Sequence, residues 1–263
     1  MQKSSDWIRP QGMAKGRAKL AMSQGMSVWV LDAPDGFGDA DVHAHHAIQL
    51  TACLSGQLAL VSDTATVRAP VAAVAADARH RFEAHGLLVF VFVEPESRLG
   101  RSLTQALFTA ADLVRLPAEA IVAQLEPLRH TFDHGLAPDA LLRAGRAAVE
   151  ALVPSAQAPL PDARVQQIID HAAAHLDQPL TLSSAAEGIF LSPSRLRHLF
   201  VEQTGLAFKT YLLWLRLVRA VQLYSEGQSL TEAAHGAGFS DSAHFSRIFR
   251  RTFGLPATTL ARL

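Results

Sequence analysis

Four side chains in the first third of the chain have the types and spacing to bind a transition metal ion. They are His43, His45, Gln49 and His80. On a β-strand, residues two positions apart point to the same face, so the rings of His43 and His45 lie together and a third group can converge on them. Three imidazoles and one amide oxygen suit Zn²⁺, Ni²⁺, Cu²⁺ or Fe²⁺. The alternative is that the same side chains line an effector pocket by hydrogen bonding, without a metal.

Two predicted helices near the C-terminus expose side chains that suit contact with DNA. The helix from Ser192 to about Thr204 and the helix from about Ser240 to Phe253 each follow a short helix and a tight turn, as in a helix-turn-helix. Their apolar residues recur on one face, so the other face meets solvent. Arginine can bond guanine bidentately, and serine or histidine can hold phosphate oxygens. The outward residues are Ser194, Arg195, Arg197 and His198 in the first helix, and Ser242, Ala243, His244, Arg247, Arg250 and Arg251 in the second.

The elements that position the histidines are predicted to be strands. Short apolar runs alternate with turn residues such as Ser55-Gly56 and His85-Gly86, which predicts an antiparallel barrel or sandwich. His46 and His85 are expected at its surface or rim. The runs are Val28–Leu31, Ala47–Leu54, Gln57–Val61, Thr66–Val74 and Leu87–Val93.

The rest of the chain is predicted to be helical, in two blocks. Helical spacing covers Leu103–Leu113, Ala118–Phe132 and Asp139–Val153, and it resumes at Arg164. A proline-rich stretch between the blocks favours extended backbone. We therefore predict a two-domain α+β protein. It has a mobile arm at 1–25, a sensor and dimerisation domain at 26–153, a linker at 154–162, and an all-α domain at 163–263 in which the long helix Phe208–Ser225 joins two helix-turn-helix units.

Composition limits the class of protein. The chain has 24 Lys and Arg against 24 Asp and Glu, and 49% of its residues are hydrophobic, which excludes a disordered chain. The neutral total at first argues against a nucleic-acid partner, but residues 162–263 hold ten basic and eight acidic residues. DNA affinity is therefore expected to depend on a few directed contacts and on dimerisation. One cysteine, Cys53, and the absence of long apolar runs predict a cytoplasmic protein without a disulfide scaffold or membrane contact.

Residues 163–253 resemble the DNA-binding domain of the AraC/XylS family of bacterial transcription regulators. The resemblance implies base or phosphate contacts at the outward residues of both helices, with His198 where the family usually has arginine. It also implies promoter or operator DNA and RNA polymerase as partners. The helices at 103–153 would join two copies into a homodimer, or only cover the barrel's own apolar face. The matching pieces are Ser192-Pro-Ser-Arg-Leu196, Thr204-Gly205, Arg216-Leu217, Gly238-Phe239-Ser240-Asp241, Phe245-Ser246-Arg247, Phe249-Arg250-Arg251 and Phe253-Gly254.

The segment from His43 to Gly56 resembles the first metal motif of the cupin barrels. His43, His45 and His80 match the three imidazoles of that family, and Gln49 stands where it has glutamate. AraC-type regulators commonly carry a cupin-like N-terminal domain, so the resemblance implies an antiparallel cupin-like β-barrel with trailing helices. Glutamine is a neutral, weaker ligand than glutamate, and regulators often keep the barrel without the metal. The motif therefore leaves metal binding open.

Together these features predict a sequence-specific DNA-binding transcriptional regulator, and not an enzyme. A small-molecule or metal effector in the cupin-like barrel is expected to change how two DNA-binding domains sit on their half-sites. One alternative is a metal-dependent cupin enzyme with an appended helical domain, but it leaves the repeated helix-turn-helix unexplained. Another is a DNA-binding protein without a ligand, in which the barrel is architectural.

Overall fold

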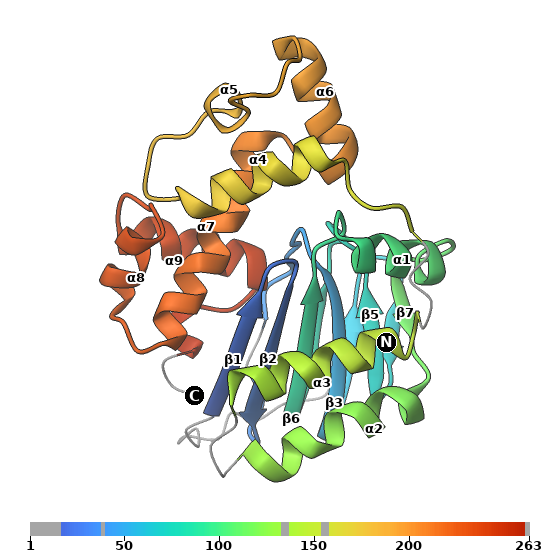
Figure 1. Ribbon diagram of the computed structural model, residues 1–263. Coiled ribbons are helices and arrows are strands. Elements are labelled where there is room, and N and C mark those ends of the chain that lie inside the picture. The colour runs from blue at the N-terminus through green and yellow to red at the C-terminus, as the bar shows by residue number, and fades with distance from the viewer. Residues whose placement is uncertain (1–16, 38–39, 133–136, 154–157, 261–263) are drawn as a thin grey trace, which may run out of the picture.

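The computed structural model describes residues 17–37, 40–132, 137–153 and 158–260. It shows a β-sheet with two helices, residues 118–131 and 138–150, over one face and a group of C-terminal helices on the opposite side (Figure 1). The strands are β1 Arg17–Ser23, β2 Met26–Ala33, β3 Ile48–Val61, β4 Thr66–Arg68, β5 Val71–Val74, β6 Arg81–Val93 and β7 Leu113–Arg115. The helices are α1 Arg98–Leu107, α2 Ala118–Thr131, α3 Pro138–Glu150, α4 Ala163–Ala174, α5 Leu182–Ala185, α6 Pro193–Thr204, α7 Phe208–Ser225, α8 Leu230–Gly236 and α9 Ser242–Phe253, followed by the 3-10 turn Ala257–Thr259.

The strands form one antiparallel sheet. Its order is β1-β2-β6-β3-β5-β7, and β4 pairs with β3 at the side of this path. An antiparallel sheet followed by a helical domain is the α+β arrangement predicted from the sequence. The pairing of the described strands runs as an open path from β1 to β7, so the closed cupin-like barrel stays a prediction.

Strand β1 corrects the expectation of a mobile arm over residues 1–25. Residues 17–23 pair antiparallel with β2, and Arg17 forms an ion pair with Asp32 at 3.0 Å. Along β1, exposed Arg17 and Lys19 alternate with half-buried Ala18 and Leu20, as is typical of an edge strand with one face on the core. The expectation missed it because charged and glycine residues surround the short apolar alternation. Residues 1–16 lie outside the described part of the chain.

Two glycines that were expected to end strands instead bend them. Gly56 in β3 pairs with Gly86 in β6, and both have positive φ, +98° and +94°. A Cβ on Gly86 would lie 2.0 Å from the carbonyl oxygen of Ser55, so the two backbones approach too closely for any side chain. The predicted runs at 47–54 and 57–61 therefore form one continuous strand, with an irregularity between Cys53 and Ser55.

Most predicted helices occur at or near their expected bounds. The long helix α7 spans Phe208–Ser225 as predicted, and Ser192 caps α6 with Pro193 in its first turn. The main difference is the stretch at 103–113, where α1 stops at Leu107 and Leu113 begins β7. Strand β7, Leu113–Arg115, pairs with β5, so tertiary contact decides its conformation.

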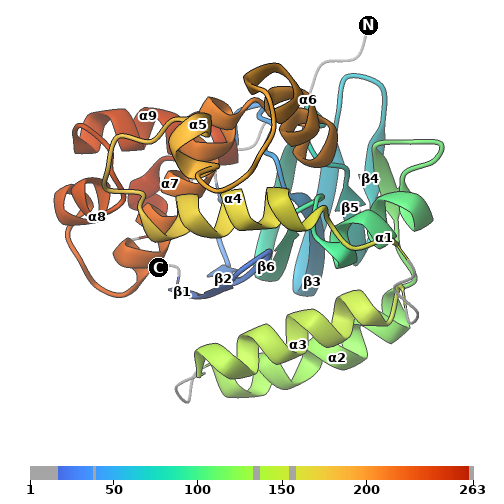
Figure 2. The same ribbon diagram turned by 45° about the horizontal axis from the view of Figure 1, so that its top comes forward.

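Both faces of the sheet are covered. One face packs against α2 and α3 through Ile121, Leu125 and Val149 among others, and the other meets α7 and α9. Figure 2 shows α2 and α3 on one side of the sheet and the C-terminal helices on the other. Such double coverage explains why Leu87–Val93 of β6 is a continuous apolar run, because an alternating pattern would leave one face in water. Among the described residues, no helix is long and apolar enough to cross a membrane.

Candidate functional site

The predicted metal-binding side chains come together against the sheet. His43 and His80 form an isolated antiparallel bridge, in which each backbone N–H donates to the other's carbonyl oxygen, at 2.8 and 2.9 Å. His45 follows in the same segment, and Gln49 lies in β3. One ring nitrogen from each histidine lies within 4.8 Å of the others. Each of the four residues is at most 5% exposed, so the cluster is shielded from bulk water.

Backbone carbonyl oxygens orient all three rings. Nδ1 of His43, His45 and His80 lies 2.8, 2.8 and 2.9 Å from a carbonyl oxygen two residues away in the chain. Because a carbonyl oxygen only accepts, Nδ1 carries the proton and Nε2 carries a lone pair. Nε2 of His80 is buried without a hydrogen-bond partner among the described residues. Metal-binding histidines are oriented in this way, with one nitrogen bonded to a carbonyl and the other free.

Gln49 brings an oxygen atom to the same cluster. Its Oε1 lies 2.9 Å from Nε2 of His45, and its Nε2 donates to Oγ1 of Thr51 at 2.8 Å. With Nδ1 of His45 protonated, the two facing atoms are both acceptors. A rotated amide that donates to His45 resolves this mismatch, and so does a cation bound by both atoms. The residues therefore fit a metal ion, and they also fit a hydrogen-bonded network.

Burial keeps the three imidazoles neutral. It lowers the pKa of His43 to about 4 and that of His80 to about 2, and neighbouring imidazoles add to both shifts. Burial also lowers the pKa of His45. Neutral imidazole is the form that binds metal, so a metal ion would not have to displace a proton from these rings.

A second buried polar group joins the two domains. Nε2 of His46 lies 3.0 Å from Oε2 of Glu96, and the hydroxyl of Tyr211 in α7 donates to Oε1 of the same carboxylate at 2.5 Å. Burial lowers the pKa of His46, but hydrogen bonds to Asp77 and Glu96 outweigh it and raise the pKa to about 9. His46 was expected at the surface or rim, and it is only 4% exposed. The expectation was wrong because α7 covers this residue, whereas His85 is exposed as expected.

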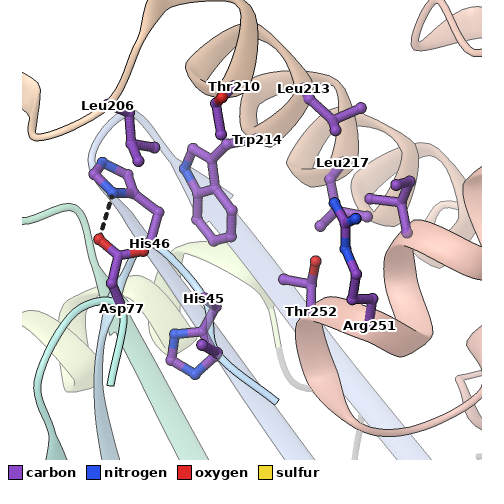
Figure 3. Close-up of a pocket in the computed structure, with 12 residues that line it drawn as sticks. His45, His46, Asp77, Leu206, Thr210, Leu213, Trp214, Leu217, Arg251 and Thr252 are labelled. Carbon is purple, nitrogen blue, oxygen red and sulfur yellow. Dashed lines mark ion pairs between the residues drawn. The ribbon is translucent and has the colours of Figure 1, made fainter. Parts of the chain in front are cut away.

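A cavity of about 140 Å³ lies beside these groups, between the domains (Figure 3). His45, His46 and Asp77 line it from the N-terminal domain, and His46 forms an ion pair with Asp77 at 3.7 Å. The opposite wall is apolar along α7 and carries one cation at the end of α9. An apolar wall with a few polar groups is typical of small-molecule sites. Its residues from the C-terminal domain include Leu213, Trp214, Leu217, Ile248, Arg251 and Thr252.

Helix α6 presents all four of its predicted DNA-contacting residues to solvent. Its N-cap, Ser192, accepts a hydrogen bond from the N–H of Arg195 at 3.4 Å, and Leu196 and Phe200 are buried. The buried pair fixes the rotation of the helix, so the opposite face is free for a partner. The exposed residues are Ser194, Arg195, Arg197 and His198.

Helix α9 repeats the arrangement. Asp241 caps it by accepting from the N–H of His244 at 2.6 Å, and Phe245 and Phe249 are buried. Of the six predicted residues, Ala243, Arg247, Arg250 and Arg251 are exposed, whereas Ser242 and His244 are half-buried. Arg250 already has a partner in the N-terminal domain, the carboxylate of Asp41. DNA contact by these residues stays a prediction.

Comparison with known proteins identifies the C-terminal helices. A family described as a helix-turn-helix domain matches residues 185–262. The chain is 38% identical over 93 residues to the transcriptional activator RhaS of Citrobacter koseri. This alignment covers 35% of this chain and 34% of RhaS. It is 34% identical over 94 residues to the regulator GbdR of Pseudomonas aeruginosa, covering 35% of this chain and 26% of GbdR. The C-terminal domain is an AraC-type helix-turn-helix domain. The match spans about a third or less of each of these relatives, and it confirms the AraC resemblance.

Solved structures are similar over nearly the whole chain. ToxT from Vibrio cholerae O395 aligns with a TM-score of 0.55 at 13% identity, covering 92% of this chain and 99% of ToxT. Another structure of Vibrio cholerae ToxT, in a P21 crystal form, gives a TM-score of 0.56 at 12% identity, covering 95% of this chain and 99% of ToxT. At this identity the likeness shows the fold, in which the AraC-type domain follows an antiparallel sheet. RhaS and GbdR are named as transcriptional regulators, which favours the regulator over the enzyme alternative.

Sequence reasoning missed the contacts of the AraC-type domain with the sheet. Glu96, Tyr211 and Trp214 lie far apart in the chain, and no local pattern joins them. A weak signal existed in Glu96, a carboxylate three residues after the end of the apolar strand β6. In the structure Glu96 is 5% exposed. A buried carboxylate needs partners, and here His46 and Tyr211 supply them.

Proposed function

We propose that this protein is a sequence-specific DNA-binding regulator of transcription. The exposed basic faces of α6 and α9 in the AraC-type domain are the observation that carries the proposal. Helix α7 joins the two units, and we propose that they enter successive segments of the major groove about one helical turn (~34 Å) apart. Promoter or operator DNA is the partner, and contact with RNA polymerase in the cytoplasm completes this function.

DNA binding is tested with the full chain and a duplex selected by the protein from random-sequence DNA. Fluorescence anisotropy measures the Kd of the wild type, Arg247→Ala, and Arg68→Ala as the control. Arg68 is an exposed arginine of β4, outside both the AraC-type domain and helices α2 and α3. Arg247→Ala is expected to weaken binding by about 1–3 kcal/mol, and the control to leave it unchanged. Equal affinities of wild type and Arg247→Ala would remove Arg247 from the interface.

We further propose that the N-terminal domain is a cupin-like sensor. Support comes from the buried histidine cluster and from the cavity, because both lie where the sheet meets α7 and α9. An effector at this place contacts the elements that hold the AraC-type domain. It would therefore shift the population of domain arrangements if it binds one arrangement better than the others.

Two classes of effector suit this place. The three histidines and Gln49 would be the ligands of a divalent transition metal ion such as Zn²⁺ or Ni²⁺, through imidazole nitrogens and the amide oxygen. The cavity suits a small organic acid, because Arg251 offers a cation and α7 an apolar wall. ToxT structures are described as bound to an unsaturated fatty acid and to (E)-4-(8-methylnaphthalen-1-yl)but-3-enoic acid. Measuring the DNA Kd with added ZnSO₄, and separately with palmitoleate, distinguishes the two classes.

A homodimer is the third part of the proposal. Helices α2 and α3 cover one face of the sheet with their buried sides, and their outer sides, which carry exposed residues such as Arg129 and Arg146, remain available to a second copy. Two copies joined through these helices would place two AraC-type domains on one operator. Sedimentation equilibrium of the full chain tests this, and a monomer at tens of micromolar would contradict it.

A further inference from the structure

One residue of the N-terminal domain contacts the end of the second DNA-reading helix through both its backbone and its side chain. The carboxylate of Asp41 accepts a hydrogen bond from Nε of Arg250 at 2.7 Å. The N–H of Asp41 donates to the carbonyl oxygen of Gly254 at 2.9 Å. The carbonyl oxygen of Asp41 lies 2.8 Å from Nδ1 of His43. Asp41 therefore connects the histidine cluster to the last turn of α9.

The contact is close and includes packed rings. Gly254 ends α9 in a left-handed conformation, with φ +71°. A Cβ at this position would lie 2.5 Å from both the carbonyl oxygen of Asp41 and Nδ1 of His43, so only glycine permits this approach. Next to it, the ring centroid of Phe253 lies 4.9 Å from that of Trp29 in β2. The end of α9 is thus held against the sheet by shape as well as by charge.

Arg250 is accessible to DNA yet already paired. It lies on the exposed side of α9, one turn after Arg247, and its side chain is 60% exposed. The guanidinium of Arg250 and the carboxylate of Asp41 form an ion pair at 2.7 Å. A DNA phosphate and the carboxylate of Asp41 are both anions that bond a guanidinium through charge-assisted hydrogen bonds. Asp41 occupies Nε of Arg250, so a phosphate that bonds this guanidinium must displace the carboxylate or lie beside a second anion.

We propose that Asp41 is a functional residue that sets DNA affinity from the sensor side, by competing with a DNA phosphate for Arg250. The inference rests on the proposed DNA-binding function. In this arrangement the base-reading face of α9 around Arg247 stays open, while one phosphate contact is withheld. Any movement of the segment that carries Asp41 and His43 then changes how readily Arg250 turns to DNA.

The test is a double-mutant cycle on the full chain. Anisotropy with the selected duplex measures the Kd of the wild type, Asp41→Asn, Arg250→Gln and the double variant. Asp41→Asn keeps the backbone contacts and removes the charge, and it is expected to tighten DNA binding about two- to fivefold, the range of an exposed ion pair. In the Arg250→Gln background the same substitution is expected to change nothing. Asp63→Asn is the control, because it removes an equal charge from an exposed turn residue of the sensor domain.

Salt dependence gives a second readout. Arg250→Gln is expected to reduce the slope of log affinity against log salt concentration by about 0.9 relative to Asp41→Asn, the value for one lost phosphate contact. An unchanged slope would mean that Arg250 does not reach a phosphate, which overturns the proposal. Equal tightening by Asp41→Asn and Asp63→Asn would show a bulk charge effect and overturn it as well.

Failure of this inference is distinguishable from failure of the proposed function. If the wild type binds the duplex and Arg247→Ala weakens it, but Asp41→Asn leaves the Kd unchanged, only the role of Asp41 is wrong. If the wild type binds no DNA, both fail. Thermal unfolding of each variant checks folding, and Asp41→Ser replaces Asp41→Asn in the cycle if the latter unfolds.

Discussion

His43 and His80 exchange two backbone hydrogen bonds, of 2.8 and 2.9 Å, and their rings meet in one buried cluster. From this pairing we expect the wild type to bind a metal ion, and we expect His80→Ala to lower the affinity for Zn²⁺ or Ni²⁺ by more than about 100-fold. Removing a hydrogen bond to a metal ligand costs about 10- to 100-fold in affinity, and removing the ligand itself costs more. Isothermal titration calorimetry measures both, with His85→Ala as control because His85 is exposed. A wild type that binds neither ion would favour the hydrogen-bonded network.

The variant Gln49→Glu separates the two interpretations of the cluster in another way. A carboxylate is a stronger, charged metal ligand, so the variant is expected to bind Zn²⁺ more tightly than the wild type. Without metal the same carboxylate is buried, since Gln49 is 2% exposed, and the Tm is expected to fall. Thermal unfolding with and without Zn²⁺ measures both effects. A Tm that Zn²⁺ does not restore would count against a metal at this position.

Crowding at Gly86 predicts a large loss of stability on substitution. Gly86→Ala places a Cβ 2.0 Å from the carbonyl oxygen of Ser55 and forces β3 away from β6. We expect the free energy of unfolding to fall by more than about 3 kcal/mol in urea titrations. Gly25→Ala is the matched control, because Gly25 also has positive φ but its Cβ would meet Ser97 at an ordinary 3.5 Å. It is expected to cost about 1–2 kcal/mol, and equal losses would refute the role of crowding.

The hydroxyl of Tyr211 is predicted to stabilise the contact between the domains. The hydroxyl of Tyr211 donates to the buried carboxylate of Glu96 at 2.5 Å, and Tyr211→Phe removes this donor. We expect the free energy of unfolding to fall by about 1–3 kcal/mol. Tyr224→Phe, at a half-buried position of the same helix, is expected to stay within about 0.5 kcal/mol of the wild type. Urea denaturation followed by tryptophan fluorescence compares the two. Similar values for both would mean that the bond to Glu96 contributes little.

Two reading helices predict two separable footprints. Arg197→Ala in α6 and Arg247→Ala in α9 are each expected to lose protection over one segment of the operator, with the segments about one helical turn, or about 10 base pairs, apart. Hydroxyl-radical footprinting on the selected DNA measures this. Loss of protection over the same base pairs in both variants would contradict the assignment of one unit to each segment.

The local part of this structure was predictable. Helix α7 and the capped start of α6 follow from apolar spacing, Ser192 and Pro193, because a helix depends on residues three and four positions apart. The choice of His43, His45, Gln49 and His80 followed from strand periodicity and from the cupin resemblance, and the four do converge. The outward faces of α6 and α9 followed in the same way from the buried faces.

What the sequence alone determined is therefore most of the helices and strands, though not β1 or β7, and which side chains share a face. Only the tertiary structure decided that α9 ends on Asp41, that Tyr211 bonds Glu96, and that Gly56 and Gly86 bend strands instead of ending them. The physical reason is distance along the chain. Periodicity and capping act within a few residues, whereas the ion pair between Asp41 and Arg250 depends on how two surfaces far apart in the chain fit together.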